Sequence, residues 1–366
     1  MTTSDSTAAR GSVTLRDIAK KTDLSVSAVS MALLDHPRIG AETKARVREI
    51  AKELGYVPNS AGRALRAKKA DAIALIVPNT SQHVFGHAYF MHVLTGVTEA
   101  ANDFDAQVSI STNPDESHGM VAYERVMRSG FADGAIVTSA SIFDDNIARL
   151  VAGGIPAVLL GRYPHIPDAV SVGVDDAAAA REATEHLVLT HGRRSLVHIS
   201  GPLDHQSAID RRDGFVAAAE SHNVAYRVIE GDFSEASGRA AVHSLRDSGV
   251  AYDAIFAAND EMAFGAMATL LADDQLVPSQ VSIVGFDDFG LSRVTSPSIT
   301  TMHVPAERMA RLAAERLFDL IAGERFAAQD AHSVLPVDLV ARQSCGCQPM
   351  QHERAVSHAP TQPKIS

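Results

Sequence analysis

From Asp71 onward, short apolar runs alternate with longer stretches of helical periodicity, and this alternation constrains the fold more than any other feature. The apolar runs are "AIALIVP", "AQVSIST", "DGAIVTS", "IPAVLLG", "SLVHIS", "DAIFAAN" and "VSIVGFDD". Unbroken apolar runs of this kind are typical of strands buried on both faces of a parallel sheet. The helical stretches between them span residues 115–129, 176–190, 211–222, 236–247 and 260–272. Strands and helices that alternate over about 270 residues predict a doubly wound α/β body, and this length favours two lobes.

Length and composition are those of a globular protein with more than one domain. The 366 residues suggest two or three domains, and 46% apolar with 21% charged residues is enough to bury a sizeable core. The sequence has no run of about eighteen apolar residues, so we expect no membrane span. Residues 1–17 lack the apolar segment of a secretion signal, and we therefore expect a cytoplasmic protein.

The only two cysteines, Cys345 and Cys347, lie close to the end of the chain. Two cysteines are too few for a disulfide framework and fit a reducing cytoplasm. A Cys-Gly-Cys segment could bind a metal, but we find no matching pair of ligands in the sequence. We therefore expect no metal site and no cofactor.

The net charge of −11 is unevenly distributed along the chain. Residues 1–70 carry 13 Lys and Arg against 7 Asp and Glu, a balance of +6, whereas the remaining residues have a balance of −17. A basic head on an acidic body is suited to approach a polyanion through the head alone. A run of charge is also commonly just a solvated face, so nucleic acid remains one of two interpretations at this point.

The head has the start and stop signals of three short helices. Thr14 followed by Asp17 resembles a capping box, and the first helix should run to about Thr22. Ser25 is placed to cap a second helix over about 26–33. A third helix should start near Ala41 and stop at Gly55. Two short helices joined by a tight turn and followed by a third are typical of a helix-turn-helix.

The second helix of the head is unusual because its outer faces carry no charge. Val29, Ala32 and Leu33 form one stripe, which should face the first helix. The side chains left on other faces are short or uncharged: Val26, Ser27, Ser30 and Met31. Short side chains let a helix approach base edges in the DNA major groove. The alternative is a three-helix cap whose uncharged face has no role.

The segment that follows the head contains one leucine among cations and alanines. Asn59 is placed to cap a helical turn over 60–66, in which Leu65 is the only bulky apolar side chain. The surrounding cations are Arg63, Arg66, Lys68 and Lys69. A leucine wedge in the DNA minor groove would explain this pattern. A linker leucine that docks on the next domain would explain it equally well.

Polar side chains follow several predicted strands of the body, where ligands bind in open parallel sheets. Pairs of polar residues follow three strands: Asp175 and Asp176 after "VSVGV", Asn259 and Asp260 after "AIFAA", and Asp287 and Asp288 after "VSIVGF". Ser207 and Arg211 follow "SLVHISGP". Such groups suit a polyhydroxylated or planar polar ligand, although an Asp after a strand is most often a helix cap.

Several of these segments together resemble the lactose/galactose repressor family of bacterial transcription regulators. The resemblance spans about residues 13–347 and is carried in the head by "VTLRDIAKKTDLSVSAVSMAL", "ETKARVREIAKELGYVPN" and "NSAGRAL". It implies that the second helix contacts operator DNA, and that the hinge helix folds on DNA with its leucine as a lever at the central base step. The implied DNA-binding residues are Thr14, Ser25, Val26, Ser27, Ala28, Ser30, Arg38, Asn59, Ala61, Leu65 and Arg66. Met31 is predicted to contact DNA as well, but the family often has Arg at this position and Asn in place of Leu34, so the resemblance implies no base choice at either residue.

The same resemblance implies an effector pocket in the body. "IDRRDGF" matches a family motif and marks Arg211, "AANDEMAFGAM" marks Asn259, "VGFDD" marks Asp287, and "GDFSEASG" marks Phe233 as a stacking ring. Tyr89 and Phe90 match an aromatic pair just before the first helix of the body. The loop "NTSQHVFGHAYF" is longer than usual, which puts His83, Phe85 and His87 at the pocket rim.

We therefore predict a repressor-like homodimer that binds a pseudo-palindromic operator, with a carbohydrate as the first choice of effector and a nucleobase or other metabolite as the alternative. The predicted segments are a flexible N-terminus (1–12), a helix-turn-helix head (13–58), a hinge (59–70), a periplasmic-binding-protein-like body (71–347) and a disordered tail (348–366). An enzyme is disfavoured because GxGxxG, GxSxG and HExxH motifs are absent from the sequence. A periplasmic solute receptor would share the body but not the basic head.

Overall fold

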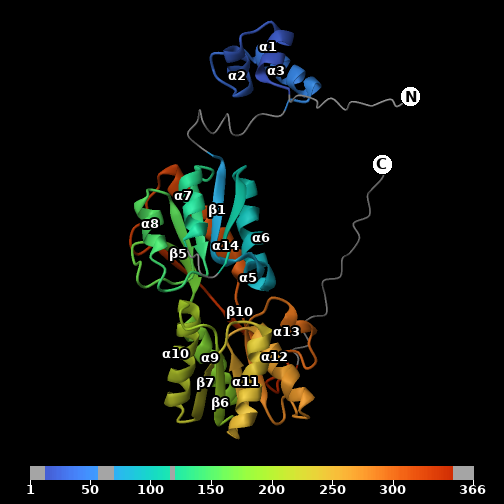
Figure 1. Ribbon diagram of the computed structural model, residues 1–366, viewed down its shortest axis with the longest axis vertical. Coiled ribbons are helices and arrows are strands. Elements are labelled where there is room, and N and C mark those ends of the chain that lie inside the picture. The colour runs from blue at the N-terminus through green and yellow to red at the C-terminus, as the bar shows by residue number, and fades with distance from the viewer. Residues whose placement is uncertain (1–12, 57–69, 116–119, 349–366) are drawn as a thin grey trace, which may run out of the picture. The chain divides into compact units, whose positions relative to one another are not determined.

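The computed structural model describes residues 13–56, 70–115 and 120–348, and the chain divides into two compact units, Met1–Ala70 and Asp71–Ser366. Figure 1 shows a small helical unit and a larger body of two lobes. The predicted N-terminus 1–12, nearly all of the predicted tail 348–366 and most of the predicted hinge lie outside the described residues. Among the predicted DNA contacts this applies to Asn59, Ala61, Leu65 and Arg66.

The helical unit, called the head, consists of α1 (Leu15–Thr22), α2 (Val26–Leu33) and α3 (Ala41–Leu54), which confirms the three predicted helices. Its core is small and closed. Ile18, Val29, Ala32 and Val47 are fully buried there, and Leu33 packs against them. The stripe predicted on α2 therefore does face the other helices.

Local capping sets the ends of the head helices. Thr14 and Asp17 form the predicted capping box, in which the backbone N of Thr14 donates to Oδ2 of Asp17 at 2.8 Å. The Ser25 hydroxyl accepts a hydrogen bond from the backbone N of Ala28 at 3.1 Å and so caps α2. Gly55 ends α3 with a φ of 68°, which a side chain would strain.

The body contains two six-stranded sheets, each in a doubly wound order. The sheet ordered β11-β5-β4-β3-β1-β2 defines the N-lobe, and the sheet ordered β12-β10-β9-β8-β6-β7 defines the C-lobe. Every pairing is parallel except the antiparallel pair β10 and β12. The N-lobe strands are β1 (Ala72–Thr80), β2 (Gln107–Asn113), β3 (Gly134–Thr138), β4 (Ala157–Leu160), β5 (Val170–Val174) and β11 (His332–Leu335). The C-lobe strands are β6 (Ser195–Ser200), β7 (Ala225–Glu230), β8 (Ala254–Ala257), β9 (Ser282–Asp287), β10 (Thr300–His303) and β12 (Asp338–Val340).

Helices flank both sheets (Figure 1). The N-lobe helices are α5 (Ser81–Gly86), α6 (Ala88–Asp103), α7 (Val121–Ser129), α8 (Asn146–Ala152) and α14 (Ala306–Ala322). The C-lobe helices are α9 (Asp176–Glu185), its continuation η1 (His186–Thr190), α10 (Gln206–Ser221), α11 (Glu235–Ser248), α12 (Asp260–Ala272) and α13 (Leu291–Val294). Because α14 packs on α6 and β4, the chain passes between the lobes after β5, after β10 and after β11. No helix among the described residues is long and apolar enough to cross a membrane.

The structure changes several predicted boundaries. The stretch 176–190 is an α-helix only to Glu185 and then becomes the π-helix η1. The helix predicted at 211–222 begins earlier, at Gln206, and Tyr89 and Phe90 lie inside the first turn of α6 instead of before it. Strand β7 was not predicted because "AYRVIE" is an edge strand with mostly exposed, partly charged residues.

Candidate functional site

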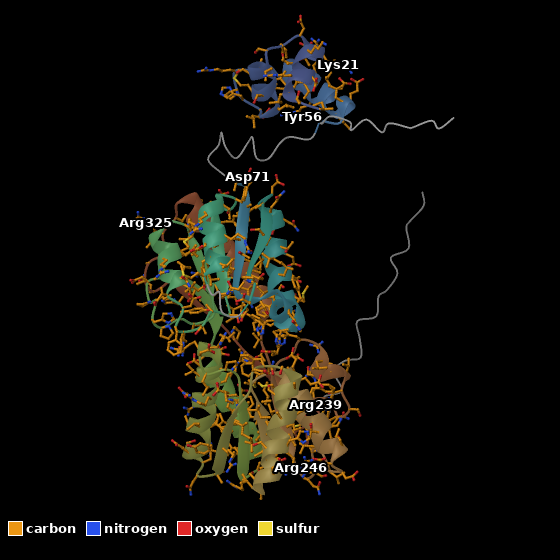
Figure 2. All side chains as sticks on the ribbon, in the orientation of Figure 1. Lys21, Tyr56, Asp71, Arg239, Arg246 and Arg325 are labelled. Carbon is orange, nitrogen blue, oxygen red and sulfur yellow. The ribbon has the colours of Figure 1, made fainter. Side chains whose placement is uncertain are left out.

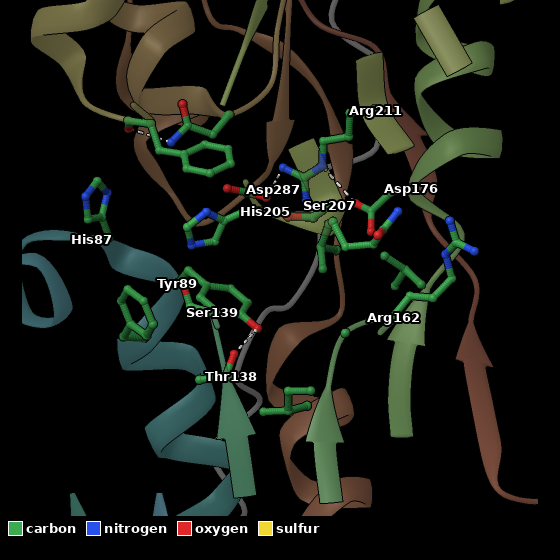
Figure 3. Close-up of a pocket in the computed structure, with 18 of the residues that line it drawn as sticks. His87, Tyr89, Thr138, Ser139, Arg162, Asp176, His205, Ser207, Arg211 and Asp287 are labelled. Atoms are coloured by element: carbon green, nitrogen blue, oxygen red, sulfur yellow. Dashed lines mark hydrogen bonds and ion pairs between the residues drawn. The ribbon is translucent and has the colours of Figure 1, made fainter. Parts of the chain in front are cut away.

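A pocket lies where the two lobes of the body meet, at the carboxyl ends of their strands. It encloses about 960 Å³ of empty space, including the part open to solvent. Figure 3 shows Arg211 between Asp176 and Asp287 on the C-lobe side, with Tyr89 and Thr138 on the N-lobe side. The pocket is therefore lined by both lobes.

Arg211 of α10 is the centre of the charged side of the pocket. Its Nε donates to Oδ1 of Asp176 at 2.7 Å, and its Nη1 lies 3.6 Å from Oδ1 of Asp287 and donates to the carbonyl of Ala258 at 2.5 Å. The guanidinium also lies 3.7 Å from the ring centre of Phe286. All three charged side chains are at most 12% exposed. The guanidinium is thus fixed in position before any ligand arrives.

Burial dominates the electrostatics of this network. Desolvation raises the pKa of Asp176 and raises the pKa of Asp287 well above its ordinary value, although the nearby Arg211 opposes both shifts. Asp287 also has a φ of 108°, an uncommon conformation for a residue other than glycine. Strain of this kind persists only where surrounding structure imposes it, and it is common at ligand sites.

A glycine sets the approach of α10 to α9. A Cβ atom on Gly214 would lie 2.1 Å from the carbonyl oxygen of Ala177, so any larger residue would force the two helices apart. Gly214 is the glycine of the "RRDGF" segment, one turn after Arg211. The close contact brings Arg211 within hydrogen-bonding distance of Asp176 in the first turn of α9.

Asn259 holds an aromatic ring at the pocket. Its Oδ1 accepts from the backbone N of Met262 at 2.9 Å and caps α12, while its Nδ2 donates to the carbonyl of Phe233 at 2.8 Å. Phe233 has a φ of 66° and lines the pocket. Its ring lies over Gly201, where a Cβ would approach it to 2.1 Å. Asn259 is therefore in part a positioning residue.

The N-lobe side of the pocket is mainly aromatic and hydroxylic. The hydroxyls of Tyr89 and Thr138 are 3.1 Å apart, and burial raises the pKa of Tyr89 to about 12, so the phenol keeps its proton. His83 and His87 also line the pocket, with ring centres 4.5 Å apart. Phe85, from the same long loop, is 61% exposed and does not line it.

Most of the predicted effector residues are brought together in this pocket. They are Tyr89, Phe90, Ser207, Arg211, Phe233, Asn259 and Asp287. Asp175 requires a correction, because its exposed side chain caps α9 by accepting from the backbone N of Ala178, and the next residue, Asp176, lines the pocket instead.

Other lining residues were missed by the sequence analysis. Arg162, which follows β4 and forms a two-bond ion pair with Asp210 of α10, could have been found by the same rule of inspecting strand ends. Thr138, at the end of β3, could have been found by the same rule. Nothing in the sequence distinguishes His205 from the other histidines, which are scattered along the chain.

In the head, the predicted DNA contacts lie on and around α2. Ser25, Val26 and Ser27 are exposed, whereas Ala28, Ser30 and Met31 are half-buried. Thr14 and Arg38 are exposed, and so is Leu34, at 61%. The third helix uses part of its positive charge internally, since Lys44 and Arg48 both pair with Asp35. Lys21 also pairs with Glu53, and Figure 2 shows the side chains of the head, with Lys21 and Tyr56 labelled.

Comparison with known proteins matches both units. Residues 14–59 match the family described as bacterial regulatory proteins, lacI family, and residues 184–345 match the periplasmic binding protein-like domain. The HTH-type transcriptional regulator CelR of Thermobifida fusca is 31% identical over 339 residues, which cover 90% of this chain and 98% of CelR. The ribose operon repressor of Halalkalibacterium halodurans is 30% identical over 333 residues, or 90% and 96% of the two chains.

Solved structures agree with this result. The CelR–cellobiose complex superposes with a TM-score of 0.70 and 28% identity, covering 91% of this chain and 99% of that one. A Lac repressor dimer bound to operator and an anti-inducer has a TM-score of 0.80 at 24% identity, covering 92% and 99%, and supports the fold. Because the identity to CelR extends through the head and both lobes, this chain belongs to the lacI family of DNA-binding bacterial transcriptional regulators.

Proposed function

We propose that this protein represses transcription from a pseudo-palindromic operator and that a neutral carbohydrate in the pocket between the lobes controls its affinity for that operator. The observation that carries the proposal is the Arg211 network. It places a fixed guanidinium and two carboxylates opposite aromatic rings in one pocket lined by both lobes. The DNA-binding surface would be α2 with Thr14 and Arg38, followed by the hinge residues Asn59, Ala61, Leu65 and Arg66.

Sugars suit this pocket for a chemical reason. Each hydroxyl both donates and accepts hydrogen bonds, so it can pair with a guanidinium and a carboxylate side by side. The apolar face of a pyranose packs well on rings such as Tyr89 and Phe233. Two relatives point the same way, since CelR has been solved with cellobiose and another relative is named for ribose.

The charged side chains of the pocket favour a neutral ligand. Asp176 and Asp287 together exceed the single charge of Arg211, and Glu261 also lines the pocket. The other cation that lines it, Arg162, is paired with Asp210. A phosphorylated or acidic sugar would face these carboxylates at short range in a low-dielectric site, which is unfavourable. A planar purine remains the second candidate because Phe233 offers a stacking face and PurR proteins are among the relatives.

A ligand that touches both lobes would change their relative orientation. Asp71, where the body begins, lies at the end of the N-lobe that is far from the C-lobe (Figure 2). In a homodimer, reorientation of the lobes would alter the spacing of the two hinges and therefore of the two heads. Coupling of about 1–3 kcal/mol would change operator affinity about 5- to 150-fold. We further propose that the protein works on DNA in the cytoplasm and has no catalytic activity.

The test has two steps. Operator sites are first selected from genomic fragments, and binding of the best site is then measured by fluorescence anisotropy with and without a panel of neutral sugars, sugar phosphates and purines. We expect a neutral sugar to shift the affinity of the wild-type protein. No preference for any fragment over random duplex would refute the operator, and a response to purines alone would refute the sugar.

A further inference from the structure

Four side chains with metal-binding atoms converge in the C-lobe, away from the pocket. They are His186 and His191, at the two ends of η1, and Cys345 and Cys347, near the end of the described chain. Their four donor atoms all lie within 4.8 Å of one another. None of the four lines the effector pocket.

The distances between these atoms are those of a tetrahedral site. Zinc lies about 2.0–2.1 Å from imidazole nitrogen and about 2.3 Å from thiolate sulfur, so tetrahedral angles place two nitrogens about 3.3 Å apart and a nitrogen about 3.6 Å from a sulfur. The Nε2 atoms of His186 and His191 are 3.2 Å apart. The measured nitrogen–sulfur distances are 3.4 Å from His186 to Cys345, 3.5 Å from His191 to Cys347 and 3.8 Å from His186 to Cys347.

The backbone on both sides is shaped to produce this arrangement. In an α-helix, residues five apart would point about 140° away from each other. The π-helix His186–Thr190 winds more loosely, with bonds from i to i+5, and brings the two histidine rings to one side. Between the cysteines, Gly346 has a φ of 111°, and a Cβ there would lie 3.2 Å from Nδ1 of His191. A side chain at this position would both strain the turn and crowd the ring.

We propose that His186, His191, Cys345 and Cys347 form a structural zinc site that fastens the C-terminal segment to the C-lobe. Two imidazoles and two thiolates are a ligand set typical of structural zinc, and tetrahedral sulfur and nitrogen ligation favours zinc over harder cations. Four protein ligands leave no position for a substrate, so the role is structural. The charges also balance, because two thiolates neutralise Zn²⁺ in a place where Cys345 is fully buried.

The segment that carries the cysteines is already hydrogen-bonded to the C-lobe sheet. The backbone N of Ile283 in β9 donates to the carbonyl of Ser344 at 2.8 Å, and the hydroxyl of Ser282 donates to the carbonyl of Cys345 at 2.8 Å. The Thr300 hydroxyl donates to Sγ of Cys345 at 3.0 Å, which is an outer contact of the kind that orients metal ligands. A metal here would link this segment to η1, more than 150 residues earlier in the chain.

This cluster corrects the expectation drawn from the sequence. Cys-Gly-Cys has a matching ligand pair after all, in His186 and His191. The pair was not recognised because it lies 154 (His191 to Cys345) to 161 (His186 to Cys347) residues from the cysteines. The Cys-x-Cys pair is also closer than the Cys-x₂₋₄-Cys spacing typical of structural zinc motifs.

The test uses the reduced, metal-free, full-length protein titrated with Co²⁺, a spectroscopic substitute for zinc. We expect one equivalent to bind, with thiolate-to-cobalt charge-transfer absorption and the intense visible bands of tetrahedral geometry, and then to be displaced by Zn²⁺. Absence of a saturable spectrum would overturn the proposal. Cobalt binding is measured without DNA or sugar. A negative result would therefore leave the proposed function untouched, and a failure of the proposed function would leave the metal site untouched.

Substitutions of single proposed ligands test whether the metal binds at this cluster. Cys347→Ser should lose about half of the charge-transfer intensity, because one of two thiolates is removed. His191→Ala should keep the charge-transfer absorption but shift and weaken the visible bands, because water replaces an imidazole in the fourth position. His222→Ala is the matched control, since this half-buried C-lobe histidine lies against Glu185 and not in the cluster. A spectrum that is unchanged in Cys347→Ser and His191→Ala would place the metal elsewhere.

Discussion

The two lobes share one fold but contribute differently to the pocket. The C-lobe supplies all of its carboxylates, Asp176, Glu261 and Asp287, together with the Arg211 that pairs with two of them. The N-lobe supplies aromatic rings and hydroxyls, and its cation Arg162 reaches across to Asp210 of the C-lobe. In the proposed function, the C-lobe is the fixed charged surface that recognises the ligand. The N-lobe surface carries aromatic rings and hydroxyls apart from Arg162, and its contact with the ligand couples binding to the orientation of the lobes.

The largest expected effect is that of Arg211→Ala. Without the guanidinium the two buried carboxylates face each other, and the fixed donor for the ligand is lost, so the ligand response of about 5- to 150-fold should disappear while DNA affinity without ligand stays unchanged. Anisotropy titrations of operator DNA with and without ligand measure this. Arg212→Ala is the control, because Arg212 pairs with Asp213 and does not line the pocket. If the operator affinity of Arg211→Ala still changes normally with ligand, the ligand does not bind in this pocket.

The next largest effect is expected for Asp260→Asn, which removes a buried C-lobe carboxylate and changes the melting temperature in a pH-dependent way. Burial raises the pKa of Asp260 to about 7, above the ordinary 3.8 of the unfolded chain. The folded state therefore binds the proton of Asp260 more tightly than the unfolded state does. The resulting contribution to the free energy of unfolding is fully present below pH 3.8 and is lost as the pH rises through about 7. Asp260→Asn should raise the melting temperature relative to wild type more at pH 8 than at pH 4. Melting curves across this range test it, and a constant difference would contradict the burial argument.

Alanine substitution of one equivalent glycine in each lobe tests the difference between the lobes. Gly214 packs α10 on α9 in the C-lobe and Gly96 packs α6 on α14 in the N-lobe, and a Cβ would lie 2.1 Å from a backbone oxygen in each. Both alanine variants should lose about 1–3 kcal/mol of unfolding free energy by overpacking. Only Gly214→Ala should also weaken the ligand response, because it separates Arg211 from Asp176. Denaturant unfolding and ligand titration measure the two effects, and equal loss of response in both variants would contradict the division of roles.

The smallest effect is expected for Tyr89→Phe in the N-lobe. The change removes the hydrogen bond between the Tyr89 hydroxyl and Thr138 and keeps the ring, at a cost of about 0.5–1.5 kcal/mol. Ligand affinity, measured by calorimetry, should fall no more than about tenfold. A loss as large as that of Arg211→Ala would show that the N-lobe recognises the ligand as strongly as the C-lobe does.

Features that depend on neighbours in the chain were predictable from the sequence. The three head helices, with Thr14, Ser25 and Gly55 at their ends, follow from side chains and backbone groups a few residues apart. Most of the buried strands follow from their apolar runs, although β10, with its three buried residues, was not predicted. Strand β7 and the π-helix η1 did not follow, because an exposed edge strand and a change of helical pitch leave little trace in apolar periodicity.

The amino-acid sequence by itself determined the caps, the helical and strand periods and the motifs that marked Arg211, in the helix after β6, and Asn259, just after β8. Only the tertiary structure decided that Asp176 and not Asp175 meets Arg211, and that two histidines meet the two cysteines. The reason is physical. Capping and periodicity act over a single helical turn, whereas these contacts join residues 35 to 161 positions apart and depend on helix crossings as close as that at Gly214.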